Sequence, residues 1–479
     1  MSIAKNTAYI TFAFIFQKIL AFVYIALIAR NLGPEIIGKY FFALSFTTIF
    51  SVFIDAGLTP ILIREVAKYK EKARSYFNSI ITLKLIFSVL TMIAIAIVIN
   101  LLGYDNFTKK LVYIASAVMF FDSFTLTFYG VLRSWQILKY EAIGIICYQI
   151  LTVTLGGIIL FTTKSIALLI GVLVISSFLN AIYSFSLAIR IAKIRIKFSI
   201  DKQFAKTLLI ASFPFMLAGI FNRVYTHIDT VLLSKLAGDI YVGWYGVANK
   251  LVFSLQFIPA AFVASIYPAM SNYFEHSKEK LKTTFEKSII YLTIISIPIC
   301  FGVVALAKEI ITTIYGNEFL NSILPLQLLM VALVFVFLYF PIGSLLNASN
   351  RQKRNTANMG IAMVVNVILN LILIPKINLA GAAIASVISQ FLMLCLGMYY
   401  ARQVVPYDKR LLSTKFIQNI ITAFIMALGI IFLKQYINWI FIIPLSAIFY
   451  FGFLYLIKGF SKNDVKEILI SIGIKKYRH

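Results

Sequence analysis

Apolar segments of about twenty residues recur along the whole chain, and they constrain its fold more than any other feature. Each could cross about 30 Å of hydrocarbon as a helix, which rises about 1.5 Å per residue. Helices must dominate, because a backbone in lipid has to satisfy its own hydrogen bonds. The sequence therefore predicts an all-α polytopic membrane protein with about 14 transmembrane helices. The fourteen segments are 9–29, 38–58, 77–101, 111–132, 141–162, 165–189, 207–233, 241–270, 288–306, 323–346, 355–374, 379–401, 415–433 and 438–457.

The charge of the chain is strongly basic, with 44 Lys and Arg against 18 Asp and Glu. The basic residues concentrate in the short segments between apolar runs, so they indicate membrane topology rather than a nucleic-acid partner. On alternate sides of the predicted membrane we count 31 and 9, while Lys18, Lys84, Arg223 and Lys250 fall inside apolar segments. The positive-inside rule then predicts a cell-membrane protein with both termini in the cytoplasm.

The three cysteines, Cys147, Cys300 and Cys395, each stand alone in an apolar segment, without paired spacing or a histidine cluster. This pattern predicts neither a disulfide nor a metal site. A nucleophile–base pair and a phosphate-cradling glycine loop are also missing from the sequence, so we expect no cofactor and no catalysis.

Two stretches 205 residues apart share the pattern G-x4-G-x-Y-x2-A. The matched pairs are Gly33 with Gly238, Gly38 with Gly243, Tyr40 with Tyr245 and Ala43 with Ala248. A repeat unit of six helices places both copies in the same membrane orientation, related by an axis along the membrane normal. We therefore predict a six-helix lobe at 1–206, a second at 207–401, two additional helices at 402–457, and a basic amphipathic tail at 458–479 on the cytoplasmic surface.

The cations inside the apolar segments are the first candidates for a binding site. Lys18 and Arg223 occupy nearly equivalent positions of the repeat, and Lys250 lies about ten residues into its segment. A charge at the bilayer centre costs at least about 2.5 kcal/mol, so such residues usually face protein or water. We predict that all three line a cleft between the lobes and bind a phosphate or diphosphate. Pairing with intramembrane acids, which would only lock helices together, is the alternative. Lys84 is expected to snorkel towards the cytoplasm.

The acids inside the segments are candidates for ion coupling. Asp122 lies near the middle of its segment, where a charge is costly, so it is a candidate for reversible protonation or cation binding; a static pair with a lysine is the alternative. Asp229 and His227 lie on one amphipathic stretch and are further candidates, although a lone histidine is often structural. For Asp55 we expect a local ion pair with Arg64.

Several motifs together resemble the prokaryotic polysaccharide transporters, which are the Wzx-type lipid-linked oligosaccharide flippases of the MOP (MATE-like) exporter superfamily. The resemblance spans nearly the whole chain. It implies two six-helix bundles with two added helices, and movement of a polyprenyl-diphosphate-linked sugar from the cytoplasmic to the outer leaflet. The motifs are A29-R-N-L-G-P-E-I-I-G-K-Y40, D55-x-G57 followed by L62-I-R64, D229-x8-G238-x4-G243-x-Y245-x2-A248-N-K250, and I314-Y-G-N-E-F319.

The resemblance also implies partners. A lipid-linked glycan is the expected substrate, surrounded by membrane lipids, and a proton or sodium gradient is expected to drive the cycle. In these transporters cations in the cleft engage the diphosphate, and the resemblance implies this role for Lys18, Arg223 and Lys250. We expect a monomer.

Three other functions are alternatives. A lipid II flippase would also require a cationic cleft, and this alternative stays open. A drug or cation antiporter of the same superfamily would need an acidic cleft, which four cations against three acids inside the segments disfavour. A membrane glycosyl polymerase would need a large outer loop with catalytic residues, yet the longest outer segment, 307–322, has about sixteen residues. We therefore expect a transporter rather than an enzyme.

Overall fold

The computed structural model describes residues 3–193, 201–457 and 459. Within this part of the chain the secondary structure is helical and contains no strand, which confirms the predicted all-α class. The predicted amphipathic tail at 458–479 lies outside the described residues, apart from Gly459.

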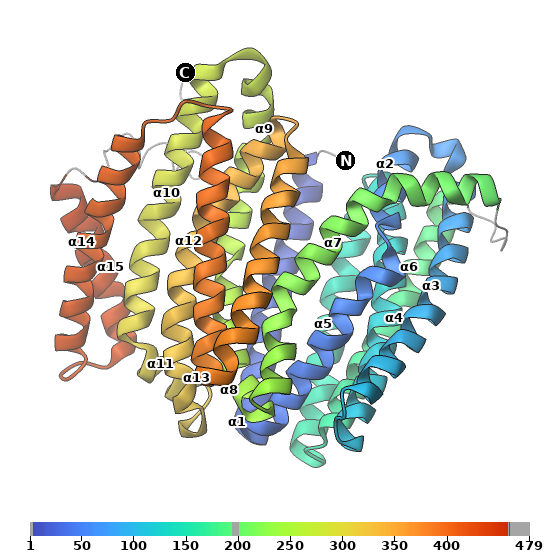
Figure 1. Cartoon of the computed structure of the whole chain (residues 1–479), viewed down its shortest axis with the longest axis horizontal. Coiled ribbons are helices and arrows are strands. Elements are labelled where there is room, and N and C mark those ends of the chain that lie inside the picture. The colour runs from blue at the N-terminus through green and yellow to red at the C-terminus, as the bar shows by residue number, and fades with distance from the viewer. Residues whose placement is uncertain (1–2, 194–200, 458, 460–479) are drawn as a thin grey trace. The chain divides into compact units, whose positions relative to one another are not determined.

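The helices follow one another with short connections (Figure 1). In chain order they are α1 Ile3–Asp55, α2 Leu58–Lys68, α3 Ala73–Leu101, α4 Asn106–Ser134, α5 Lys139–Thr162, α6 Ile166–Ala192, α7 Lys202–Leu236, α8 Asp239–Leu255, α9 Phe257–His276, α10 Lys278–Ala305, α11 Ala307–Ile314, α12 Ile323–Ala348, α13 Gln352–Arg402, α14 Lys409–Leu433 and α15 Trp439–Leu456, with 3₁₀ turns at Lys70–Lys72 and Asn317–Ser322.

Two helices are each long enough for two membrane crossings. α1 is bent at Gly33, whose φ is 76°, and α13 is bent at Ile377 and Asn378, where Asn378 has a φ of 48°. In Figure 1 the chain reverses its direction at each of these bends. Twelve helical stretches of the described chain are long and apolar enough to cross a membrane. Counting both arms of α1 and of α13 therefore gives the fourteen predicted crossings.

Contacts between helices divide the chain into two compact units. Unit 1 comprises the described residues of 1–247 together with 367–382, and unit 2 those of 248–366 together with 383–479. The division falls inside α8 and inside α13. The lobe boundary at 206, which rests on the sequence repeat, stays a prediction.

Unit 1 is held together at one end by a buried apolar cluster. Leu62 of α2 and Phe77 of α3 pack there with Phe128 of α4 and Leu208 of α7. Elsewhere in the unit, small residues let helices approach closely: a Cβ on Gly156 of α5 would lie 2.7 Å from Cε2 of Tyr24. Such contacts stabilise helices in a membrane, where burying apolar side chains against one another gains little over burying them in lipid.

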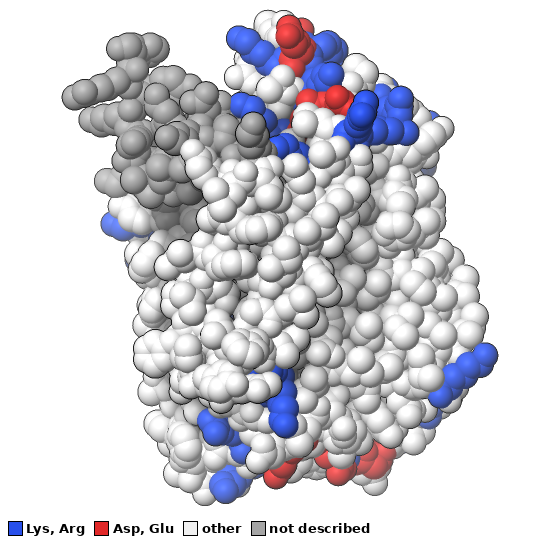
Figure 2. Space-filling view, turned by 90° about the vertical axis from the view of Figure 1, so that its left-hand side faces the viewer, with Lys and Arg blue, Asp and Glu red and all other residues white. Residues whose placement is uncertain are grey.

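The outward surface is apolar over most of the helices. Large side chains such as Leu101, Phe161 and Ile448 are exposed, a pattern suited to lipid and costly in water. Figure 2 shows Lys, Arg, Asp and Glu gathered mainly towards the ends of the helices, with few of them between. The chain is therefore a multi-pass membrane protein.

Candidate functional site

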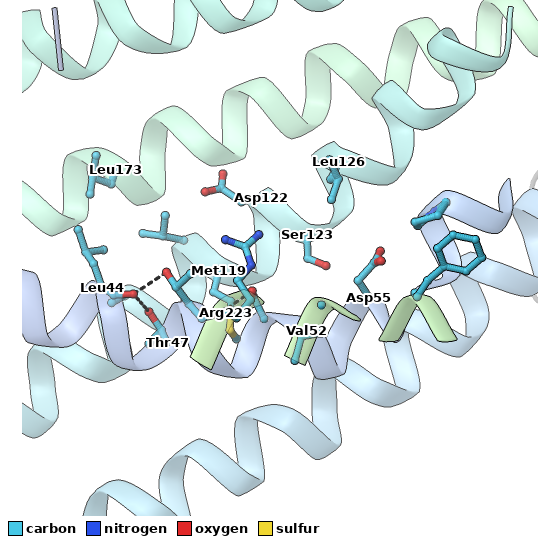
Figure 3. A pocket seen from close by; sticks show the side chains of 18 of the residues that line it. Leu44, Thr47, Val52, Asp55, Met119, Asp122, Ser123, Leu126, Leu173 and Arg223 are labelled. Carbon is cyan, nitrogen blue, oxygen red and sulfur yellow. Dashed lines mark hydrogen bonds between the residues drawn. The ribbon is translucent and has the colours of Figure 1, made fainter. Parts of the chain in front are cut away.

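A cavity of about 530 Å³ lies among the transmembrane helices of unit 1. Its walls come from α1, α2, α4, α5, α6 and α7, and most of them are apolar, as at Leu44, Val52 and Leu173. Three charged residues also line it: Asp55 of α1, Asp122 of α4 and Arg223 of α7 (Figure 3). Charges among membrane-spanning helices are expensive unless water or an ion reaches them, so the cavity is the strongest candidate site in this unit.

Arg223 reaches the cavity because α7 approaches α1 closely one turn earlier. A Cβ on Gly219 would lie 2.8 Å from Cγ2 of Val52, so the glycine allows the two helices to meet there. In Figure 3 the guanidinium of Arg223 lies in the middle of the view, turned towards Asp122, with Asp55 further along the wall. A planar guanidinium in such a place can bind two oxygens of a phosphate at once.

One of the lining residues, Asp55, contacts a buried ammonium. Lys84 of α3 has no exposed surface, and its Nζ donates hydrogen bonds to Asp55 Oδ1 at 2.8 Å, to the carbonyl of Ser123 at 2.8 Å and to Thr127 Oγ1 at 2.7 Å. The hydroxyl of Thr59 donates to the same Asp55 oxygen. All three ammonium protons therefore have acceptors, which a buried lysine requires.

This network corrects two expectations. Lys84 does not snorkel, because a carboxylate and two further oxygens lie within its reach inside the bundle. Asp55 does not pair with Arg64, which instead pairs with its neighbour Glu65 at 2.7 Å. The sequence carried a signal for the true pair, since an acid and a lysine both lay inside apolar segments and each needed a partner.

The charge around the cavity is balanced. The carboxylate of Asp55 is neutralised by Lys84, which leaves Asp122 opposite Arg223. With all four groups ionised the formal charge is zero, so the cavity is less cationic than the sequence suggested. Protonating Asp122 would give it a net positive charge centred on Arg223.

The other two predicted cations lie elsewhere. Lys18, on the first arm of α1, is half-buried and is not among the residues that line this cavity. Lys250, on α8, belongs to unit 2. The structure thus brings Arg223 together with Asp122, and the roles of Lys18 and Lys250 remain predictions.

Asp229 and His227 both have polar neighbours within unit 1. Asp229 is 6% exposed and accepts hydrogen bonds from Tyr245 Oη at 2.8 Å and from Asn370 Nδ2 at 2.7 Å. Nδ1 of His227 lies 3.4 Å from the hydroxyl of Ser45. These contacts join α7 to α8, α13 and α1, and the coupling roles of both residues remain predictions. Among the described residues, no three or more His, Cys, Asp or Glu gather where they could hold a metal ion.

Comparisons with known proteins identify two matching family models and several relatives. The family model described as "Polysaccharide biosynthesis protein" matches residues 3–274, and the MatE model matches residues 214–372. The capsular polysaccharide biosynthesis protein CapF of Staphylococcus aureus is 26% identical over 84% of this chain and 99% of its own length. The probable low-salt glycan biosynthesis flippase Agl15 of Haloferax volcanii is 25% identical over 81% of each chain.

A solved structure shares the fold. The lipid II flippase MurJ, in an inward closed conformation, aligns with a TM-score of 0.78 over 94% of this chain and 98% of its own, at 19% sequence identity.

Proposed function

Because the chain belongs to the polysaccharide biosynthesis protein family, we propose that it is a flippase for surface-glycan biosynthesis. It moves a polyprenyl-diphosphate-linked oligosaccharide from the cytoplasmic to the outer leaflet of the cell membrane. The names of CapF and of the Agl15 flippase support this assignment, and so does the multi-pass helical fold. Both termini face the cytoplasm, as the distribution of 31 and 9 basic residues favours.

The observation that carries the proposal is Arg223 inside a cavity among the membrane helices. A phosphate crossing the membrane needs compensating charge and hydrogen-bond donors in place of water. The guanidinium of Arg223 supplies both in a planar arrangement suited to a diphosphate. Lys18 and Lys250 add positive charge to the pathway as the substrate moves.

Asp122 couples an ion to this binding. While it is ionised it competes with the substrate for Arg223, and once protonated it leaves the guanidinium free for the diphosphate. Asp55 cannot play the same part, because Lys84 already neutralises it. The ion whose gradient drives the cycle binds and leaves at Asp122, and Asp229 and His227 are further coupling residues.

The experiment that tests this function is depletion of the protein in its own cell. A lipid-linked glycan should then accumulate with its sugar on the cytoplasmic face, where an impermeant glycosidase added outside cannot reach it, and the wild-type gene should restore access. Normal outer-leaflet glycan after depletion would contradict the proposal. If the accumulated species is the cell-wall precursor, the chain is a lipid II flippase instead.

A second candidate is an exporter of organic cations. The match of the MatE model to residues 214–372 and the two carboxylates that line the cavity favour it. Cells that overproduce the chain would then expel a fluorescent organic cation in a gradient-dependent way. Equal retention of the dye by cells carrying an empty vector would remove this candidate.

A further inference from the structure

The two copies of the duplicated glycine motif contact each other in unit 1. A Cβ added to Gly38 of α1 would lie 2.8 Å from the carbonyl carbon of Asp239 and closer still to its oxygen. A Cβ added to Gly243 of α8 would lie 2.6 Å from the carbonyl carbon of Pro34, and again closer to the oxygen. Each glycine therefore packs directly against the backbone of the other copy.

These two contacts are equivalent. The shift of 205 residues that relates the repeats carries Pro34 onto Asp239 and Gly38 onto Gly243. Gly38 on Asp239 and Gly243 on Pro34 are thus one contact made twice, as two copies related by a two-fold axis would make it.

The first glycine of each motif has a matching role as well. Gly33 has a φ of 76° and Gly238 a φ of 110°, values that favour glycine. Gly33 forms the bend of α1, and Gly238 forms the turn between α7 and α8. In each copy one glycine reverses the chain and the next, five residues on, allows the close approach.

Polar contacts surround the glycine contact on the same end of the helices. Nζ of Lys39 lies 3.7 Å from Asp105 and 3.9 Å from Asp239. Ser234 donates a hydrogen bond to Asp239 at 2.5 Å, and Lys235 donates to the carbonyl of Leu102 at 2.6 Å. The charge distribution of the sequence assigns this end to the outer side of the membrane.

We propose that this reciprocal contact is the outer gate of the transport pathway, with Lys39 as its latch. The inference rests on the proposed transport function. A contact made by glycine and backbone needs no side chain to repack, so it can close tightly and separate as a unit. The surrounding ion pairs lie at the water-facing end, where separated charges are readily solvated. Opening the gate would release the lipid-linked glycan to the outer leaflet.

The first test adds one methyl group at the contact. Gly38→Ala and Gly243→Ala should keep the gate from closing fully. Gly157→Ala should not, because a Cβ at that position would meet only open space. The background lacks Cys147, Cys300 and Cys395 and carries Ser51→Cys in the cavity as reporter. A membrane-impermeant maleimide added outside should label the reporter several-fold faster in both glycine variants than in the control. Equal labelling in all three overturns the proposal, as does an increase confined to reagent on the cytoplasmic side.

The second test does not depend on how well the glycine variants fold. In the same background but without the Ser51→Cys reporter, whose thiol the reagent would also modify, Lys39→Cys and Asp239→Cys in one chain are joined by a short bis-thiosulfonate. It links the two cysteines through disulfides that a reductant cleaves. Joining them should stop glycan transport, and reduction of the linker should restore it. A joined protein that transports at its unjoined rate overturns the gate. Maleimide labelling does not require the substrate. If the glycine variants change labelling as expected but the wild-type protein moves no glycan, the result supports the gate and contradicts only the proposed transport function.

Discussion

Nζ of Lys84 lies 2.8 Å from Oδ1 of Asp55, and the lysine side chain has no exposed surface. The pair joins the end of α1 to the middle of α3, and Thr127 and the Ser123 carbonyl link it to α4. Asp55 also lines the cavity that contains Arg223. The pair therefore fixes one wall of the candidate site and sets its charge.

Replacing Lys84 by methionine should destabilise the protein strongly, because the carboxylate of Asp55 would remain in the bundle without its counter-charge. Loss of one partner of a buried pair typically costs about 3–5 kcal/mol. Thermal unfolding in detergent should show a much lower midpoint for Lys84→Met. Asp55→Asn combined with Lys84→Met should recover part of the loss, since neither charge is then left alone.

The control for that measurement is Arg64→Ala. Arg64 pairs with Glu65 at 2.7 Å, but its side chain is 47% exposed, and exposed pairs contribute only about 0–1 kcal/mol. Its unfolding midpoint should stay close to that of the wild type. A Lys84→Met protein as stable as Arg64→Ala would show that the buried pair does not hold this wall.

Replacing Arg223 by alanine should slow glycan transport about 10- to 100-fold, because a hydrogen bond to a charged group contributes roughly 1.5–3 kcal/mol. Arg223→Lys should retain part of the activity, since it keeps the charge but loses the planar pair of donors. Transport is measured as outer-leaflet appearance of a labelled lipid-linked glycan in proteoliposomes. Wild-type rates from an Arg223→Ala, Lys18→Ala double variant would refute the proposed binding role.

Asp122→Asn should uncouple transport from the ion gradient. The amide resembles the protonated acid and cannot gain or lose a proton, so Arg223 stays available for the substrate at every pH. Wild-type transport should respond to an imposed proton or sodium gradient, whereas that of the variant should be nearly independent of it. An Asp122→Asn protein with the gradient dependence of the wild type would exclude this residue from coupling.

Asp105 should make the stability of α4 depend on pH. It caps the helix by accepting hydrogen bonds from the backbone N–H groups of Phe107 and Thr108. Partial burial acts to raise the pKa of Asp105, but the hydrogen bonds from Thr108 and the charge of Lys39 outweigh it and hold the pKa below its usual value. The stabilisation is thus present above the unfolded-state pKa and is lost as pH falls through the lower folded value.

Asp105→Ala should remove that dependence together with the cap, at a cost of about 0.5–2 kcal/mol. The measurement is the unfolding midpoint between neutral and acidic pH for both proteins. The two curves should converge at the acidic end, where Asp105 is protonated in the wild type. Curves that stay parallel over the whole range would assign the acid sensitivity to other groups.

The number of membrane crossings and the helical class were predictable from the sequence, because both follow from local chemistry. A run of apolar residues that must satisfy its own backbone bonds in lipid becomes a helix whatever surrounds it. The bend at Gly33 required little more, since the polar break between two apolar runs and the glycine were visible in one short stretch.

The partners of charged residues were not predictable in the same way. Asp55 has Arg64 nine residues away and Lys84 much further along the chain, yet the distant lysine is its partner, because helix packing rather than sequence separation sets which side chains meet. The same holds for Asp122 and Arg223, which come from α4 and α7.

The sequence by itself determined that a glycine motif was present twice, and it supplied the apolar lengths that make the chain a membrane protein. Only the tertiary structure decided that Gly38 and Gly243 pack on the backbone of the opposite copy. Hydrophobic length and backbone propensity act within one segment. Close approach of helices and charge pairing depend instead on which helix faces meet, and that is a property of the packed bundle.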